Sequence, residues 1–253
     1  MRGIMKDQEV GLDPNFRYRG KNQTRVETFS DAAFALAITL IVLSSSVPSN
    51  FQDLWVSMRD IIPFGLCVIL VMVIWYQHYL FFLKFGLQNR TIVLYNTFLI
   101  FLILIYVYPL KFLFVVLFRL YEGIFTGNRE LINRLFTETL PYSDTGSLMI
   151  IYGLGASLIF LTIGGMYRHA MKMAGPLELN SYERYIAKDG MITNLLLASI
   201  PFLSALIAVF HLFGNWTFLG AGVAYMLYPP VMIIYGRVSA KKRDRALAIY
   251  KKA

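Results

Sequence analysis

The sequence predicts an all-α integral membrane protein with six transmembrane helices. Of its 253 residues, 57% are hydrophobic and 15% are charged, and the mean hydropathy is +0.56. A soluble domain of this length carries more charge, so lipid is the expected solvent of this chain. Six apolar stretches reach the roughly 20 residues that a helix needs to cross a bilayer. They lie at about 29–48, 61–83, 91–118, 147–167, 191–212 and 216–236.

The first stretch has two interpretations. Residues 32–43 have the length of the apolar region of a signal peptide, and residues 44–49 resemble a cleavage region. Glu27 and Asp31 directly adjoin the apolar core, which argues against cleavage. We therefore expect a permanent first span.

Three later features are expected from turn and helix chemistry. The third stretch is longer than a bilayer requires and contains Pro109 and Lys111, so we expect a kink and a helix that emerges on the far side. The fifth and sixth stretches are separated only by a tight turn around Gly214 and Asn215, which predicts a helical hairpin. Small residues in the fourth stretch predict close helix packing within the subunit; they are Gly153, Gly155, Gly164 and Gly165.

The distribution of basic residues predicts the orientation. Lys and Arg crowd the N-terminal segment, the loops near residues 84–90 and 168–188, and the C-terminal tail. We expect a multi-pass protein of the cell (plasma) membrane. By the positive-inside bias, both termini are cytoplasmic, and 119–146 is the main external loop. The predicted division is a basic N-terminal segment at 1–27, a six-helix transmembrane domain at 28–237 and a basic tail at 238–253.

The residue types exclude several functions. The net charge of +9 is explained by topology, so we expect no nucleic-acid partner. The single cysteine, Cys67, cannot form an intrachain disulfide or a cysteine-based metal cluster. His169 and His211 lack metal-ligand spacing. No paired carboxylates, His-Glu-x-x-His or Gly-x-Ser-x-Gly motif occurs, so we expect neither an enzyme nor a cofactor.

The first span carries polar residues near its cytoplasmic end. Asp31 is costly close to hydrocarbon unless it is paired, and Arg25, Ser30 or a side chain of a neighbouring span is a possible partner. The alternative is that Ser30 and Asp31 cap the start of the helix.

One stripe of this span also carries Ala32, Leu36, Thr39 and Leu43. Periodicity alone favours ordinary packing, with the threonine bonded back to its own helix. If the stripe faced a symmetry axis instead, leucine rings and a hydroxyl ring would line a path for ions.

Two motifs resemble a known family. Arg25-x-x-x-Phe29-Ser30-Asp31, followed by Ala-x-x-Ile-Thr39-Leu, resembles the signature of the transmembrane protein 175 family of potassium channels. A weaker match is Trp75-x-x-His78 with Asn96, whereas the last three spans resemble the family only in topology.

The resemblance implies a potassium channel, modestly selective over sodium, in which the first helix of each subunit lines a central pore in a homotetramer. By this resemblance, the pore is lined by Leu36, Thr39 and Leu43, and its hydrophobic constriction acts as the gate. Potassium is the one metal ion expected, and it passes near Thr39. A polar network is implied to hold this helix; its members are Arg25, Phe29, Ser30, Asp31, Trp75, His78 and Asn96. The expected partners are further copies of this chain, which complete the homotetramer, and the lipid bilayer.

The chain departs from the family pattern at two places. Residues 44–46 are serines where relatives often carry an acidic residue, which puts cation attraction at the outer mouth in doubt. A leucine at the constriction, where relatives use isoleucine, is expected to preserve the gate and to alter selectivity. The Thr-Val-Gly-Tyr-Gly filter of P-loop channels is absent.

A secondary transporter and a structural membrane scaffold are the alternatives. A transporter normally has inverted repeats, interrupted helices and ionisable residues near the midplane, and this sequence indicates little of these. A scaffold leaves the Phe29-Ser30-Asp31 motif without an explanation.

Overall fold

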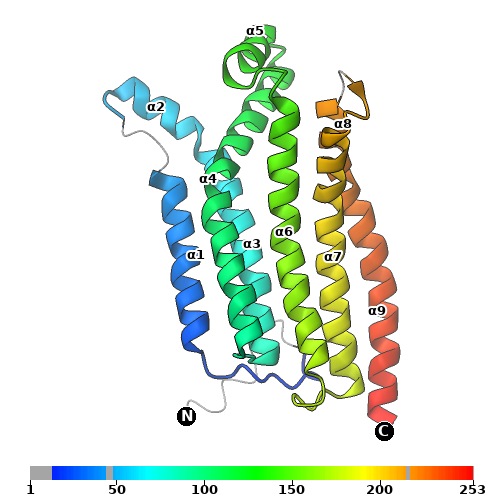
Figure 1. The fold of residues 1–253 in the computed structure, drawn as a ribbon. Helices are drawn as coiled ribbons and strands as arrows, with labels where there is room; N and C mark the ends of the chain where they lie inside the picture. The colour runs from blue at the N-terminus through cyan, green and yellow to red at the C-terminus, as the bar shows by residue number, and fades with distance from the viewer. Residues whose placement is uncertain (1–12, 44–47, 215–216, 253) are drawn as a thin grey trace.

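A computed structural model describes residues 13–43, 48–214 and 217–252. Six candidate membrane spans lie within the described residues, which confirms the predicted all-α fold (Figure 1). They are α1 (Arg25–Leu43), α3 (Ile61–Phe85), the Arg90–Val107 part of α4 (Arg90–Thr126), α6 (Thr145–Lys172), α7 (Ser181–Val209) and the broken helix Thr217–Lys251.

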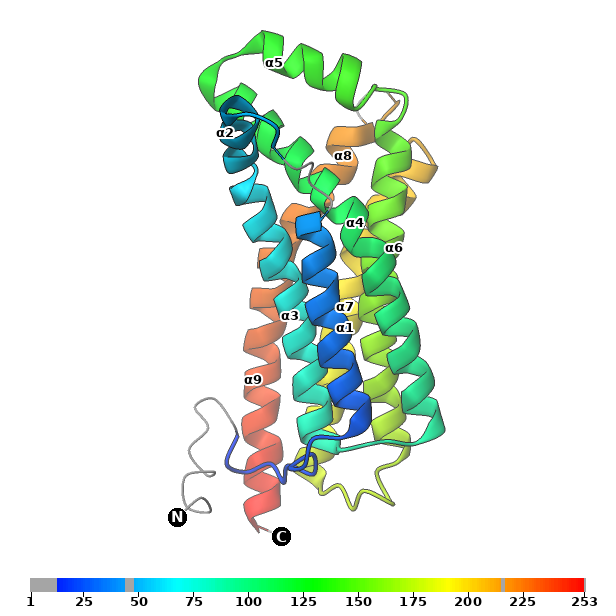
Figure 2. The same ribbon diagram turned by 90° about the vertical axis from the view of Figure 1, so that its left-hand side faces the viewer.

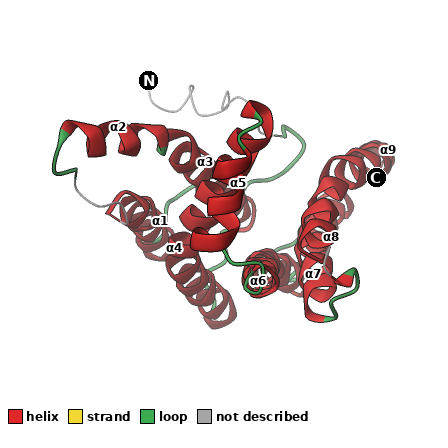
Figure 3. Cartoon of the chain, turned by 90° about the horizontal axis from the view of Figure 1, so that it is seen from above, coloured by secondary structure: helices red, strands yellow, loops and turns green. Residues whose placement is uncertain are grey.

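The spans form two groups joined along α4 and α6. Viewed from above, α1, α3 and α4 lie together, and α6, α7 and α9 (Tyr228–Lys252) form the other group (Figure 3). At one end of the bundle lie the amphipathic helix α2 (Phe51–Arg59), the short α5 (Arg129–Arg134) and a π-helix at Leu135–Thr139. The C-terminal end of α9 and the α6–α7 connection lie at the other end (Figure 1).

The start of α1 corrects one expectation. Thr24 Oγ1 accepts a hydrogen bond from the Glu27 amide at 3.2 Å, and Glu27 Oε1 accepts one from the Thr24 amide at 3.3 Å. This reciprocal capping box starts the helix at Arg25. The interpretation of Ser30 and Asp31 as helix caps is therefore wrong, because both lie more than one turn inside α1. Residues 44–47, which include the serines after the stripe, lie outside the described residues.

The third span is a long, bent helix, as expected. Pro109 lies within the 37 residues of α4, and α4 changes direction midway along its length (Figure 2). Because proline has no amide hydrogen and its ring clashes with the preceding turn, a bend there has a local cause. The predicted external loop at 119–146 is mostly helical instead, because α4 continues to Thr126 and α5 follows directly.

The sixth span is interrupted, which the sequence interpretation missed. α8 (Thr217–Val223) passes into a 3₁₀ turn at Ala224–Leu227 before α9 begins. Pro229 and Pro230 occupy the first turn of α9, where their missing amide hydrogens cannot continue the preceding helix. The predicted hairpin turn is described only up to Gly214, which has a φ of 53°.

Glycines bring α6 close to its neighbours. A Cβ added to Gly153 would lie 2.8 Å from Ala205 Cβ and would also collide with the Pro201 carbonyl of α7. Gly155 faces the ring of Tyr106 in α4 with equally little room. The prediction that these glycines serve packing within the subunit is confirmed.

Candidate functional site: the exposed face of α1

The two faces of α1 have different surroundings. Ser30, Phe34, Ala37 and Ile41 are buried, at intervals of three and four residues, where α1 packs on α3 and α4. The opposite face is exposed within this chain, although nearly all of its residues are apolar or small. It carries Arg25, Phe29, Ala32, Leu36, Thr39 and Leu43.

The three residues predicted to line a pore lie together on that exposed face. Leu36 and Leu43 are 50% and 71% exposed, so neither contributes to the core of the subunit. Thr39 Oγ1 donates a hydrogen bond to the Ala35 carbonyl at 3.0 Å. A hydroxyl oxygen that donates in this way keeps lone pairs with which it can accept or coordinate.

A buried hydrogen-bonded cluster anchors the other face of α1. Asn96 Nδ2 of α4 donates to Ser30 Oγ at 2.8 Å, and Asn96 Oδ1 lies 2.7 Å from His78 Nε2 of α3. All three residues are at most 3% exposed. Because unpaired polar groups are costly at such a place, the cluster favours one register of α1 against both helices.

Asp31 belongs to a second contact. The Trp75 indole N–H donates to Asp31 Oδ1 at 2.8 Å, and Gln23 Nε2 donates to Asp31 Oδ2 at 2.9 Å. Among the described residues, Asp31 forms no ion pair with Arg25. Arg25 and Phe29 are exposed on α1 and join neither contact, so the structure assembles five of the seven residues expected in the network.

The far end of α1 is held by a cation. Lys111 Nζ of α4 donates to the Ile41 carbonyl at 3.3 Å, close to the C-terminus of α1. A positive charge is favourable there because the helix dipole places partial negative charge at a C-terminus. The sequence associated Lys111 with the bend of the third span and its emergence on the far side, without predicting this contact with α1.

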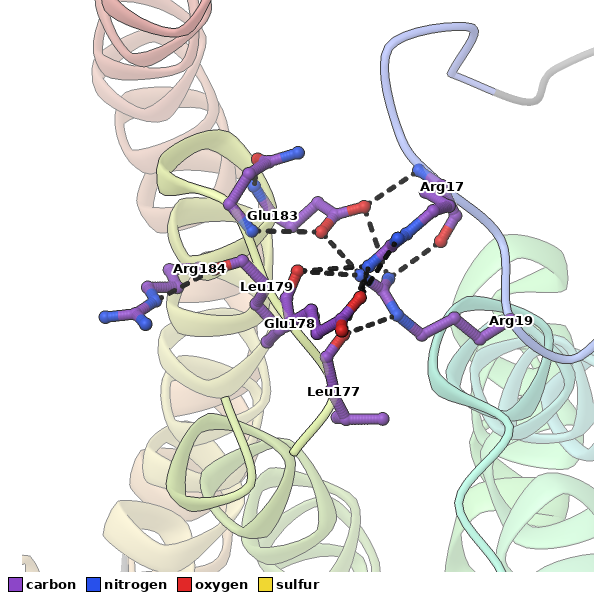
Figure 4. Close-up of polar contacts among 8 residues, drawn as sticks. Arg17, Arg19, Leu177, Glu178, Leu179, Glu183 and Arg184 are labelled. Carbon is purple, nitrogen blue, oxygen red and sulfur yellow. Dashed lines mark hydrogen bonds and ion pairs between the residues drawn. The ribbon is translucent and has the colours of Figure 1, made fainter. Parts of the chain in front are cut away.

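The segment before α1 contacts α7, a contact the sequence did not predict (Figure 4). Arg19 Nη2 donates to Glu183 Oε2 at 2.6 Å, and the Arg17 amide donates to Glu183 Oε1 at 2.9 Å. Glu183 also caps α7 through Asn180. The only available signal was the Asn-x-x-Glu capping pattern, which gives the start of α7 without indicating its distant partner.

A resident metal site is not found in the described residues. No three His, Cys, Asp or Glu side chains there are grouped so as to hold a metal ion. His169 Nε2 instead lies 2.8 Å from Asn89 Nδ2, and Cys67 is a buried free thiol.

Comparison with known proteins places these residues in a family. The family model described as endosomal/lysosomal potassium channel TMEM175 matches residues 25–109, which include the exposed stripe, the Ser30–Asn96–His78 cluster and the Asp31–Trp75 pair. A protein of Marivirga tractuosa named "Potassium channel" is 54% identical over 239 residues, covering 94% of this chain and 96% of that protein. The chain belongs to the TMEM175 family.

Solved TMEM175 structures have the same fold. A threonine-to-alanine variant of the potassium channel MtTMEM175, crystallised with a nanobody–MBP fusion, matches with a TM-score of 0.82 and 52% identity. That match covers 92% of this chain and 100% of the other. A homologue from Chamaesiphon minutus matches with a TM-score of 0.51 and 17% identity over 85% and 96% of the two chains, which supports the fold alone.

Proposed function

We propose that this protein is a potassium channel whose pore is lined by the exposed face of α1. The observation that carries the proposal is that Leu36, Thr39 and Leu43 share one uncovered helix face, in a chain 54% identical to a protein named as a potassium channel. Helix faces that no element of the same chain covers contact lipid or another subunit. A hydroxyl between two leucines suits an axis along which ions pass.

Four copies around one axis complete the pore in this proposal. Closed symmetry is the general rule for homo-oligomers, and each copy contributes one α1. In this proposal the protein lies in the cell membrane, and the basic residues at 1–27 and 238–253 support a cytoplasmic position for both termini. Residues 28–237 then form the channel domain.

The stripe supplies a gate and a modest filter. The Leu36 ring forms the hydrophobic constriction, which closes by dewetting, and Leu43 forms a second apolar ring. The Thr39 hydroxyls replace part of the hydration shell of potassium, which favours it modestly over sodium. On the buried side of α1, Ser30 binds Asn96 of α4, which in turn lies next to His78 of α3, and this cluster holds α1 in register.

Flux into liposomes containing the purified protein tests this function. We expect potassium to enter ahead of sodium, and an impermeant organic cation to be excluded. Leu36→Ala should raise single-channel current, because a smaller ring widens and wets the constriction. Leu154→Ala, at a 42% exposed leucine of α6, is the matched control and should leave the current unchanged. Equal currents in the wild type and the Leu36→Ala variant would remove Leu36 from the pore.

A further inference from the structure

A cavity of about 390 Å³ lies among α3, α7 and α9, away from the stripe of α1. Its volume falls in the range of roughly 300–1,000 Å³ that is usual for small-molecule sites. In the described residues α3 and α9 do not contact each other, and they stand apart on the two groups of spans (Figure 3). The N-terminal segment adds Asp13, Phe16 and Tyr18 to the lining.

Four charged side chains line this cavity, two of each sign. The cations are Lys84 of α3 and Arg243 of α9, and the carboxylates are Asp13 and Asp189. Within the described part of the chain, none of the four forms a direct ion pair. The formal charges of the lining therefore sum to zero, and the cations are not in direct contact with the carboxylates.

Hydroxyl groups hold both carboxylates in place. Tyr235 donates to Asp189 Oδ1 at 2.7 Å, and Ser239 donates to the same oxygen. Tyr182 donates to Asp13. Burial raises the pKa of the Asp13 carboxyl, but hydrogen bonds from Tyr182 and Asn15 outweigh it and hold that pKa below its usual value. Asp13 is thus a carboxylate at neutral pH, and carboxylates have lone pairs for further donors.

We propose that this cavity binds a phosphoethanolamine group, carried by a membrane lipid. Its phosphate oxygens accept hydrogen bonds from Lys84 and Arg243, and its ammonium group donates hydrogen bonds to the carboxylates of Asp189 and Asp13. A neutral zwitterion matches a cavity with two charges of each sign. An anionic headgroup without an amine would face two carboxylates, and a choline headgroup has no N–H to donate to them.

The position of the cavity favours a lipid as the carrier. Lys84 lies one residue before the end of α3, at the end of the bundle assigned to the cytoplasm. One turn deeper, Leu80 of α3 also lines the cavity, and Met232 of α9 lies deeper than Arg243. Tyrosines, which prefer the headgroup level of a bilayer, line it too; they are Tyr18, Tyr76, Tyr167 and Tyr235. The cavity thus has charged groups near the end of the bundle and apolar side chains farther in, the order that a lipid headgroup and the start of its acyl chains require.

Native mass spectrometry of the full-length protein tests the assignment. The protein is titrated with phosphatidylethanolamine, phosphatidylglycerol and phosphatidylcholine of matched acyl chains, and we expect the first to bind most tightly. Lys84→Met and Arg243→Gln should each weaken that lipid about tenfold, because each removes a charge-assisted hydrogen bond. Lys241→Gln is the matched control, since Lys241 is an exposed cation of α9 outside the lining of this cavity, and it should change nothing.

Asp189→Asn tests the balance of charge. It leaves a net positive cavity, so the preference should move from phosphatidylethanolamine toward phosphatidylglycerol, a change that a merely structural defect would not produce. Soluble phosphoethanolamine is added in a further titration. Failure to compete at equal concentration supports the lipid, whereas competition with equal affinity overturns the lipid as carrier.

Two results would overturn the site itself. One is equal binding of the three lipids by the wild-type protein. The other is unaltered binding by Arg243→Gln and Asp189→Asn variants that remain monodisperse and helical. Lipid binding is measured without ion flux, so its failure is distinguishable from a failure of the channel function.

Discussion

Arg19 and Glu183 form a buried ion pair, 2.6 Å between Nη2 and Oε2, that ties the segment before α1 to the start of α7. Glu183 is fully buried and the Arg19 side chain is 13% exposed. The backbone of the same segment lies against α3, because the Gly20 amide donates to the Leu83 carbonyl at 3.0 Å. A Cβ at Gly20 would collide with the carbonyl of Phe82. The entry into α1 is thereby attached to both groups of spans.

Glu183→Gln should destabilise the protein by about 3 kcal/mol, because it leaves the Arg19 guanidinium buried without its counter-charge. The free energy of unfolding in detergent measures this loss. Glu178→Gln is the control, since its ion pair with Arg17 is at 3.4 Å and the Glu178 side chain is 79% exposed. That variant should change stability by less than about 1 kcal/mol. Equal effects of the two substitutions would contradict a special role for the buried pair.

Ser30→Ala should lower stability by about 1–3 kcal/mol, because Asn96 Nδ2 loses its acceptor in a buried place. It should also reduce potassium flux in liposomes, since the register of α1 is then held less firmly. Ser199→Ala removes an exposed hydroxyl that donates to the Leu196 carbonyl of the same helix, so it should affect neither measurement. Flux that stays at the wild-type level in a Ser30→Ala protein of normal fold would separate this cluster from the positioning of α1.

Thr39→Ala should narrow the potassium-to-sodium permeability ratio by roughly two- to five-fold, the equivalent of about 0.5–1 kcal/mol for one weak polar contact. Reversal potentials under asymmetric potassium and sodium give this ratio. Thr39→Ser keeps the hydroxyl and should preserve the ratio. If both variants match the wild type, the bond from Thr39 to the Ala35 carbonyl is a packing feature only.

Gly153→Ala should push α6 away from α7, because the new methyl group meets the Pro201 carbonyl and Ala205 Cβ. Overpacking of this kind costs about 1–3 kcal/mol, which a lowered melting temperature in detergent would reveal. Gly65→Ala has open space around its new Cβ within the chain. It should be neutral or slightly stabilising, since alanine favours helix more than glycine does. A Gly153→Ala protein as stable as the wild type would show that α6 and α7 repack freely.

Sequence patterns located the spans well where one physical signal dominated. Long apolar stretches predicted six helices, and the proline in α4 predicted its bend. Boundaries were less accurate where capping decided them. With Thr24 as its cap, α1 begins four residues before the predicted position 29, and with Asn180 as its cap, α7 begins ten residues before the predicted position 191. The break before α9 was missed because its apolar residues continue through the 3₁₀ turn while Pro229 and Pro230 change only the hydrogen bonding.

The sequence by itself determined that this chain is a six-span membrane protein and which residues of α1 share a stripe, because hydropathy and helical period are local properties. The tertiary structure decided which stripe is buried. It pairs Ser30 with Asn96 and Asp31 with Trp75, 66 and 44 residues away, and so leaves Leu36, Thr39 and Leu43 uncovered. It also joined Arg19 to Glu183 and surrounded one cavity with four separated charges. These contacts link residues far apart in the chain, and only the packing of whole helices brings such residues together.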